Sequence, residues 1–162
     1  MINQNELVGP QIFAQFADRY DDRIKKAVGI LFLTSGAVET SLSVLLARLA
    51  SHPGEINSRL AFAFSGMDVR VKLSKLCDLC VGTNVDRSQI THVTQSISKL
   101  FERRNAIAHN LCDPSGENIR ILNLKIVRNG LKADQIFTAD RIEKIAALML
   151  VRSRQLDALI PK

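Results

Sequence analysis

The sequence predicts an all-α protein, a bundle of about five helices with a β-hairpin inserted before the last helix. Two observations lead to this prediction. Apolar residues recur every three or four positions along most of the 162-residue chain, which is the period of an amphipathic helix. One stretch differs, because apolar and polar residues alternate on both sides of Asn129-Gly130, a dipeptide typical of tight hairpins. The chain has the length of one ordinary domain, so we expect residues 1–162 to form a single unit.

The first two helices are expected in the N-terminal third of the chain. Pro10 can occupy a first helical turn, and an apolar stripe follows it at Ile12, Phe13, Phe16 and Tyr20. A longer helix is expected over about residues 22–50, where apolar residues recur at spacings of three, four and seven. The triplet His52-Pro53-Gly54 predicts the end of this helix.

Two further helices precede the hairpin, and one follows it. The third is expected over about residues 56–81, where Ser65-Gly66 can interrupt it. The fourth is expected over about residues 86–109, closed by the turn-forming residues 113–116. After the hairpin, Thr138 can cap a last helix with its side-chain oxygen.

Composition and charge favour some partners over others. The hydrophobic fraction of 46% and the charged fraction of 23% are normal for a globular protein. The net charge of +6 suits a polyanion such as nucleic acid, although Lys and Arg are scattered and form no basic tail. Aromatic residues make up 5% and include no Trp, which disfavours binding by base stacking on an aromatic platform.

The expected location is the cytoplasm, with no membrane association. Residues 1–6 are polar and lack the basic-then-apolar pattern of a signal peptide. We expect charges to break the apolar stretches short of a membrane span. Three cysteines, an odd number in an ordinary composition, indicate a reducing compartment rather than a disulfide framework.

The fourth predicted helix carries a charge where an apolar residue is expected. Its stripe consists of Ile90, Val93, Ile97, Leu100, Arg104 and Ala108. A charge at the Arg104 position must be paired, or must face a cleft or a second subunit, because burying it alone is costly. A homodimer that brings two such helices together is the simplest explanation.

Polar residues gather beside Arg104 at the end of this helix. Asn105 and His109 lie one turn apart and should project together, and Glu102 lies on the same side one turn earlier. The long side chain of Arg104 can reach that face. A helix C-terminus also favours the protonated form of His109.

The segment from Arg104 to His109 resembles the signature of the HEPN superfamily, named for higher eukaryotes and prokaryotes nucleotide-binding. That signature is an Arg, usually followed by a polar residue, and then a His about four to six residues after the Arg. The resemblance extends to Glu39 in the long second helix, to the Lys72-Leu73 pair and to a hairpin before the last helix. It covers nearly the whole chain, and the six residues from Arg104 to His109 are its specific part.

The resemblance implies an activity. Many HEPN proteins are metal-independent RNA endonucleases, often toxins or effectors of phage defence, whose two motif helices build one site across a homodimer. Arg104 would then hold the scissile phosphate, and His109 would act as general base or acid on the 2′-hydroxyl or the leaving 5′-oxygen. Asn105 would bind the phosphate or orient His109. The implied partners are RNA, a second copy and an antitoxin or regulatory protein, with no cofactor.

Other interpretations of the same residues stay open. The chain could be a non-catalytic HEPN-like module that binds nucleotide, RNA or protein, or the motif could only make interhelical hydrogen bonds. Arg103 and Lys99 could extend a phosphate-binding track or form an ordinary solvated face. Glu102 and Glu39 would support the site; Glu39 is either a boundary carboxylate or a partner for a basic residue such as Arg104, Arg70 or Lys72.

The cysteines allow a metal site in principle. Cys77 and Cys80, with His109 and Cys112, would make four candidate zinc ligands. However, Cys77 and Cys80 lie on or beside an apolar stripe, where cysteine usually behaves as a small hydrophobic residue. We therefore expect no metal. His52, before Pro53, and His92, on the polar side of the fourth helix, are interpreted as ordinary surface residues.

Overall fold

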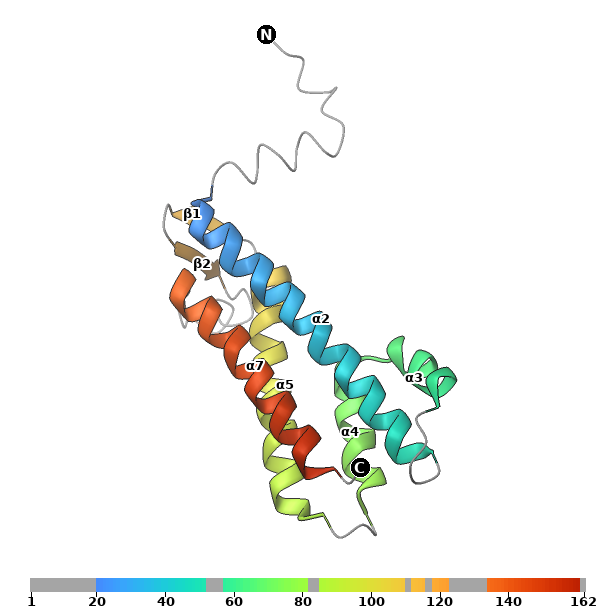
Figure 1. Ribbon diagram of the computed structural model, residues 1–162. Coiled ribbons are helices and arrows are strands. Elements are labelled where there is room, and N and C mark those ends of the chain that lie inside the picture. The colour runs from blue at the N-terminus through green and yellow to red at the C-terminus, as the bar shows by residue number, and fades with distance from the viewer. Residues whose placement is uncertain are drawn as a thin grey trace.

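The computed structural model describes residues 20–51, 57–81, 85–109, 112–115, 118–122 and 134–160. Within these ranges five helices and a small antiparallel sheet are present (Figure 1). The helices are α2 (Asp22–Ala50), α3 (Ser58–Ser65), α4 (Val69–Leu79), α5 (Arg87–His109) and α7 (Ala139–Leu159), and the strands are β1 (Cys112–Ser115), β2 (Asn118–Leu122) and β3 (Asp134–Thr138). The predicted fold class, an all-α bundle with a β insertion before the last helix, is confirmed. The helix expected after Pro10 lies outside the described residues, except for Tyr20, which packs against the core.

Helix α2 extends along the length of the bundle, and α7 packs beside it (Figure 1). Ion pairs join the two helices at both ends, between Arg23 and Asp140 at their starts and between Arg48 and Asp157, 2.8 Å apart, near their ends. The two helices therefore run in the same direction. Helix α5 packs against α7, and α4 packs between α2 and α5, so the core is formed mainly by α2, α5 and α7.

Side-chain caps explain where the helices begin. Asp21, Asn57, Asp68 and Thr138 each accept a hydrogen bond from a backbone N–H in the first turn of the helix that follows. The predicted cap by Thr138 is thus confirmed. The predicted interruption at Ser65-Gly66 is also present, because α3 ends at Ser65 and α4 begins three residues after Gly66. One expected helix over residues 56–81 is therefore two.

The β insertion has one strand more than a hairpin. Strands β2 and β3 pair as expected, with Ile119 opposite Phe137, while the predicted Asn129-Gly130 turn lies outside the described residues. Residues 113–116 were expected only as a turn, but 112–115 form β1, which pairs with β2. The strand order β1-β2-β3 places Pro114 in an edge strand, where its missing N–H is tolerated.

Helix α2 is more apolar than the sequence analysis expected. Between Lys26 and Arg48 its single charged residue is Glu39, and an 18-residue window has a mean hydropathy of 1.7. By length and composition α2 could therefore cross a membrane. The core helix of a bundle meets the same criteria, and 44% of this window is buried in the bundle. Glu39 breaks the apolar stretch of α2, as expected, but this single charge leaves the helix within the length and composition of a membrane span.

Candidate functional site

The apolar stripe of α5 continues to the end of the helix with a small rotation. Ile90, Val93, Ile97 and Leu100 are buried as predicted. In the last two turns Phe101 and Ile107 are buried, whereas Ala108, expected on the stripe, is exposed. Burying the larger Ile side chain removes more apolar surface from water than burying Ala would, which explains this difference.

The side chain of Arg104 is accommodated by residues of its own chain. Its side chain is half-buried, and the guanidinium carbon lies 4.5 Å from the centre of the Phe32 ring on α2. This distance is typical of a cation–π contact. Nη1 donates a hydrogen bond of 3.0 Å to Oδ1 of the adjacent Asn105. The Nε atom is buried and has no hydrogen-bond partner among the described residues.

The Arg104 pocket, of about 270 Å³, lies between α2, the start of α4 and α5. It brings together four of the predicted site residues, Glu39, Glu102, Arg104 and Asn105. The remaining lining residues are Met67, Asp68, Val69, Arg70, Ser98 and Phe101. Nη2 of Arg70 lies 3.5 Å from Oε1 of Glu102, so an exposed ion pair joins the α4 and α5 sides of the pocket. Such a pair adds little stability and can open for a ligand.

A buried lysine supports the wall of this pocket. Lys72 is 1% exposed, and its Nζ donates hydrogen bonds to the backbone carbonyls of Glu39, at 3.4 Å, and Ser65, at 3.2 Å. The contact between Lys72 and Glu39 therefore uses the backbone of Glu39 and leaves its carboxylate at the pocket. That carboxylate forms no ion pair within the described part of the chain.

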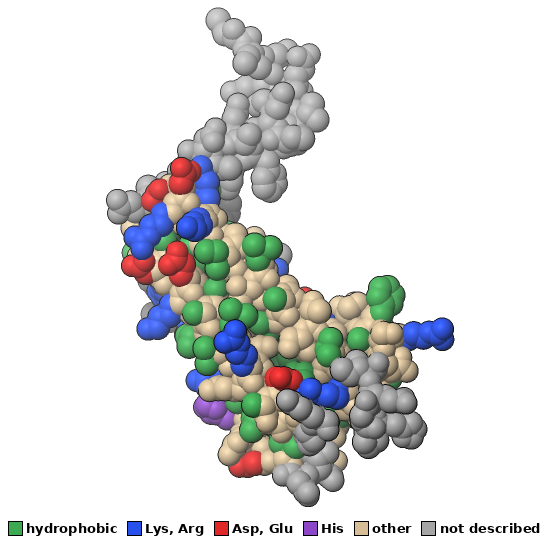
Figure 2. All heavy atoms as spheres, viewed as in Figure 1, with side chains coloured by type: hydrophobic (Ala, Val, Ile, Leu, Met, Phe, Trp, Pro, Cys, Tyr) green, Lys and Arg blue, Asp and Glu red, His purple; other side chains and the backbone are tan. Residues whose placement is uncertain are grey.

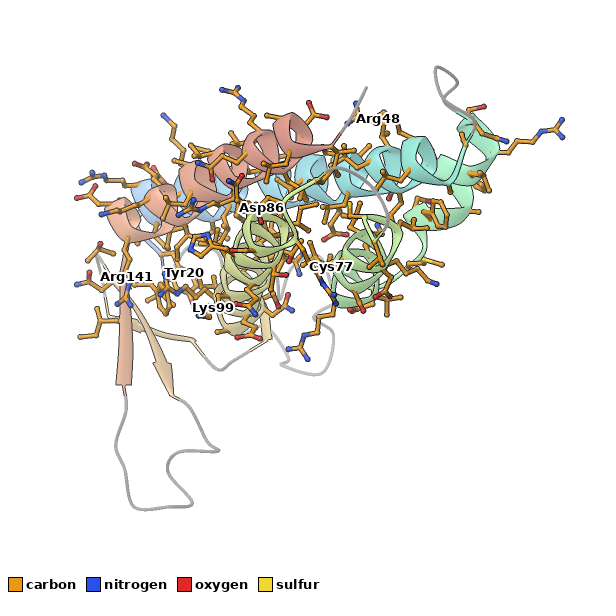
Figure 3. All side chains as sticks on the ribbon, turned by 90° about the horizontal axis from the view of Figure 1, so that it is seen from below. Tyr20, Arg48, Cys77, Asp86, Lys99 and Arg141 are labelled. Atoms are coloured by element: carbon orange, nitrogen blue, oxygen red, sulfur yellow. The ribbon has the colours of Figure 1, made fainter. Side chains whose placement is uncertain are left out.

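Lys99 and Arg103 do not line the Arg104 pocket. Both are exposed on α5, and Figure 3 shows Lys99 on the side of α5 away from α2. His92 precedes Lys99 by seven residues and Arg103 by eleven, so the three share one side of the helix. They form a basic row along α5.

A second cavity, the α5–α7 groove, includes His92 in its lining. It is an open groove of about 550 Å³ lined by Ser88, Gln89, His92, Val93, Arg152, Gln155, Ala158 and Leu159. Nη1 of Arg152 donates a 2.6 Å hydrogen bond to Oε1 of Gln155. The described residues that line this groove include no carboxylate, whereas three carboxylates line the Arg104 pocket. The groove thus offers a better electrostatic environment for an anion.

His109 is the last residue of α5, one turn after Asn105. Its side chain, like that of Cys112 in β1, lies outside the described part of the chain. The structure therefore places the backbone of His109 beside the pocket residues of α5 and leaves the predicted grouping of its imidazole with Asn105 untested.

Cys77 in α4 and Cys80 at the end of α4 pack in the core. Sγ of Cys77 lies 3.4 Å from Oγ1 of Thr94. Cys80 is 7% exposed, and burial raises the pKa of its thiol, with a further increase from neighbouring Cys77. Among the described residues no group of three or more His, Cys, Asp or Glu side chains could hold a metal ion.

Sequence reasoning missed two contributors to the site. Phe32 lies beside the buried stripe of α2, and its contact with Arg104 depends on how two distant helices pack. Asp68 lines the pocket because it caps α4, and an Asp followed by an apolar-periodic run was a detectable signal. Arg70 had been considered only as a partner for Glu39, and it pairs with Glu102 instead.

No protein-family model, curated protein or solved structure matches this chain. Function is therefore inferred from the side chains of the two cavities and from the Arg104-to-His109 motif.

Proposed function

We propose that this protein is a metal-independent RNA endonuclease of the HEPN kind, with Arg104, Asn105 and His109 as its catalytic residues. The observation that carries this proposal is the way in which Phe32 and Asn105 hold the guanidinium of Arg104. Phe32 holds its guanidinium at a pocket, and Asn105 is its one hydrogen-bond partner among the described residues. A guanidinium fixed in this way retains donors for a phosphate, whose oxygens match its planar geometry.

The chemistry assigns a role to each residue. Arg104 binds the scissile phosphate and stabilises the charge that develops on its oxygens. Asn105 accepts a hydrogen bond from Arg104 through Oδ1, so its amide N–H groups can bind a second phosphate oxygen. His109 removes the proton of the ribose 2′-hydroxyl or protonates the leaving oxygen. The 2′-oxygen bonds to phosphorus as the bond to the 5′-oxygen breaks, which yields a 2′,3′-cyclic phosphate and a 5′-hydroxyl.

In this proposal the flanking RNA backbone follows α5. The basic row of His92, Lys99 and Arg103 leads from the α5–α7 groove toward the helix end that carries Arg104. Contacts of Lys and Arg with phosphate supply sequence-independent, salt-sensitive affinity. Glu102, on the same helix as Arg104, is paired with Arg70, which offsets part of the repulsion between the carboxylates of the pocket and a phosphate.

We also propose a cytoplasmic location, a homodimer and control by a partner protein. A cytoplasmic enzyme of this kind acts as a homodimer that brings two copies of the motif together. A toxin or a phage-defence effector also needs a partner that restrains it, such as an antitoxin. No metal or cofactor takes part in the proposed reaction.

The test is cleavage of total RNA by the purified wild type and by single variants. His109→Ala should lower the cleavage rate about a hundredfold to ten-thousandfold, because it removes proton transfer, and should leave RNA binding largely intact. Arg104→Lys keeps the charge but loses the bidentate fork, so it should also lose most of the activity. Gln95→Ala is the matched control, since it truncates an exposed side chain of the same helix that lines neither cavity and lies outside the basic row.

Three further results separate this enzyme from a binding module. Cleavage should persist in EDTA, the products should carry 2′,3′-cyclic phosphates, and DNA should not be cut because it lacks the 2′-hydroxyl. A binding module would associate with RNA in a salt-dependent manner and cleave at no pH. Full activity of His109→Ala, or cleavage only with added Mg²⁺, would rule out the proposed site.

A further inference from the structure

The Arg104 pocket has an excess of carboxylates. Three of them line it together with the guanidinium groups of Arg70 and Arg104. The described lining therefore has a net negative charge, which repels a phosphate that enters deeply. Within the described part of the chain, no group of acidic side chains is arranged to hold a metal ion. Because a carboxylate only accepts hydrogen bonds, the interior of the pocket suits a neutral group with several N–H donors.

Glu39 is the one of these three carboxylates that no described side chain or backbone group engages. Asp68 accepts the backbone hydrogen bond that caps α4, and Glu102 belongs to the ion pair across the pocket. Figure 2 shows acidic side chains beside basic ones at the starts of α2 and α7, as in the ion pair of Arg23 with Asp140. Glu39 is half-buried and has no such partner, so its two oxygens are available to a ligand.

One helix sets the spacing between Glu39 and the guanidinium of Arg104. Phe32, whose ring centre lies 4.5 Å from the guanidinium carbon, precedes Glu39 by seven residues on α2. Two helical turns place both side chains on the same side of α2, about 10 Å apart along its axis. A nucleotide has a comparable reach from its phosphate to the far edge of its base. A phosphate at Arg104 therefore lets the base of the same nucleotide reach Glu39.

The size and walls of the pocket suit a single base. Its volume of about 270 Å³ is below the roughly 300 to 1,000 Å³ of pockets that hold drug-sized ligands, so it has room for part of a nucleotide. Met67, Val69 and Phe101 supply apolar surface for a flat ring. Arg70 and Ser98 add hydrogen-bond donors to the lining, which can serve the acceptor atoms of a base.

Guanine matches this lining better than the other bases do. Its Watson–Crick edge presents N1–H and the N2 amino group side by side, and the two oxygens of one carboxylate can accept from both. Its O6 and N7 atoms are acceptors for an arginine. Adenine and cytosine place an acceptor nitrogen beside their amino group, and uracil flanks N3–H with two carbonyls. Each of these three bases would set a lone pair against the carboxylate of Glu39.

We propose that Glu39 is a specificity-determining residue that binds guanine in the Arg104 pocket, so that guanosine-containing RNA is the favoured substrate. The assignment of the adjoining phosphate to Arg104 rests on the proposed function. Glu39 contacts the base and not the reacting atoms. Its effect can therefore be measured by binding alone, without cleavage.

The first test is isothermal titration calorimetry of the full-length chain with guanosine 3′,5′-bisphosphate and inosine 3′,5′-bisphosphate. Inosine lacks only the N2 amino group, so one oxygen of Glu39 loses its donor. The wild type should bind the guanosine compound about tenfold to a hundredfold more tightly, because a hydrogen bond to a charged group is lost with inosine. Equal affinities, or no binding of either compound at millimolar concentration, would overturn the proposal.

The second test replaces the carboxylate without changing its size. The amide of Glu39→Gln has one donor and one acceptor group, so it cannot accept from both N–H groups of guanine. The preference for guanosine over inosine should fall below about threefold. Lys72 and Ser43 bond to the backbone carbonyl of Glu39, so the fold should not depend on its carboxylate, and the circular dichroism spectrum should be unchanged.

Glu143→Gln is the matched control for this variant. Glu143 is also half-buried, but it lies on α7 and lines neither the Arg104 pocket nor the α5–α7 groove. It should keep the full preference for guanosine. A Glu39→Gln protein that keeps the wild-type preference, or a Glu143→Gln protein that loses it equally, would contradict the assignment of Glu39.

Cleavage of RNA oligonucleotides that contain a single guanosine separates this proposal from the proposed enzyme. The wild type should cut next to the guanosine. Cleavage at every position alike would leave the enzyme in place and overturn the guanine pocket. A preference for the guanosine compound over the inosine compound without any cleavage would support the guanine pocket and overturn the proposed enzyme.

Discussion

Arg104→Met tests whether Arg104 serves the fold or the function. The substitution keeps an unbranched side chain against Phe32 and removes the guanidinium. The buried Nε without a described partner costs about 1 to 3 kcal/mol in the wild type. The cation–π contact with Phe32 offsets about 0.5 to 2 kcal/mol of this cost. The hydrogen bond to exposed Asn105 offsets about another 0.5 to 1 kcal/mol.

These contributions nearly cancel. The free energy of unfolding of Arg104→Met should therefore stay within about 1 kcal/mol of the wild-type value. Urea unfolding followed by circular dichroism measures it, with an unchanged m-value as the check that the same transition is compared. Ile97→Ala, at a fully buried position of the same helix, is the contrast and should lose about 2 to 5 kcal/mol.

A loss above about 2 kcal/mol in Arg104→Met would refute this reasoning, because it would make Arg104 a structural residue. A double-mutant cycle with Phe32→Leu checks the stacking contact itself. The coupling energy between Phe32 and Arg104 should be about 0.5 to 1.5 kcal/mol for a half-buried guanidinium. A coupling near zero would show that the ring does not hold the guanidinium.

Two further predictions concern buried groups near the site. Lys72→Met should leave the free energy of unfolding within about 1.5 kcal/mol of wild type, whereas Lys72→Ala should lose about 2 to 5 kcal/mol, because the packed stem matters more than the ammonium. Equal losses in urea unfolding would contradict this. For Cys80, burial raises the pKa of the thiol above its unfolded-state value of about 8.5. Above that pH the unfolded state loses the thiol proton more readily than the folded state does. The free energy of unfolding should therefore be highest below about pH 8.5 and should decrease as the pH rises toward the folded-state pKa. Unfolding measured at neutral and alkaline pH should show a decrease in stability that is smaller in Cys80→Ala.

Local patterns accounted for most of the helical structure. The α2 helix occupies the residues expected from its apolar spacing, and Pro53 and Gly54 follow close after its end. The cap by Thr138 and the interruption at Gly66 depend on residues within one turn of the helix ends. Signals of this kind are readable because both partners of each interaction are neighbours in the sequence.

The unpredicted features depend on contacts between distant segments. The contact of Phe32 with Arg104 and the burial of Lys72 against α2 and α3 both arise from the packing of separate helices. Strand β1 forms because β2 offers it a partner, although Asp113 and Pro114 favour a turn locally. The sequence therefore identified Arg104 and three of its pocket neighbours, but it could not identify Phe32, whose contact with Arg104 depends on helix packing.

The position of Arg104 bears on how a dimer would form. From the sequence, a charge on the apolar stripe of α5 suggested that this helix meets a second copy. In the structure the stripe from Ile90 to Leu100 is buried within the chain, and Phe32 and Asn105 accommodate Arg104 at the pocket. The stripe of α5 thus needs no second copy to be buried. A homodimer with a composite site would therefore have to form through a surface other than this buried stripe.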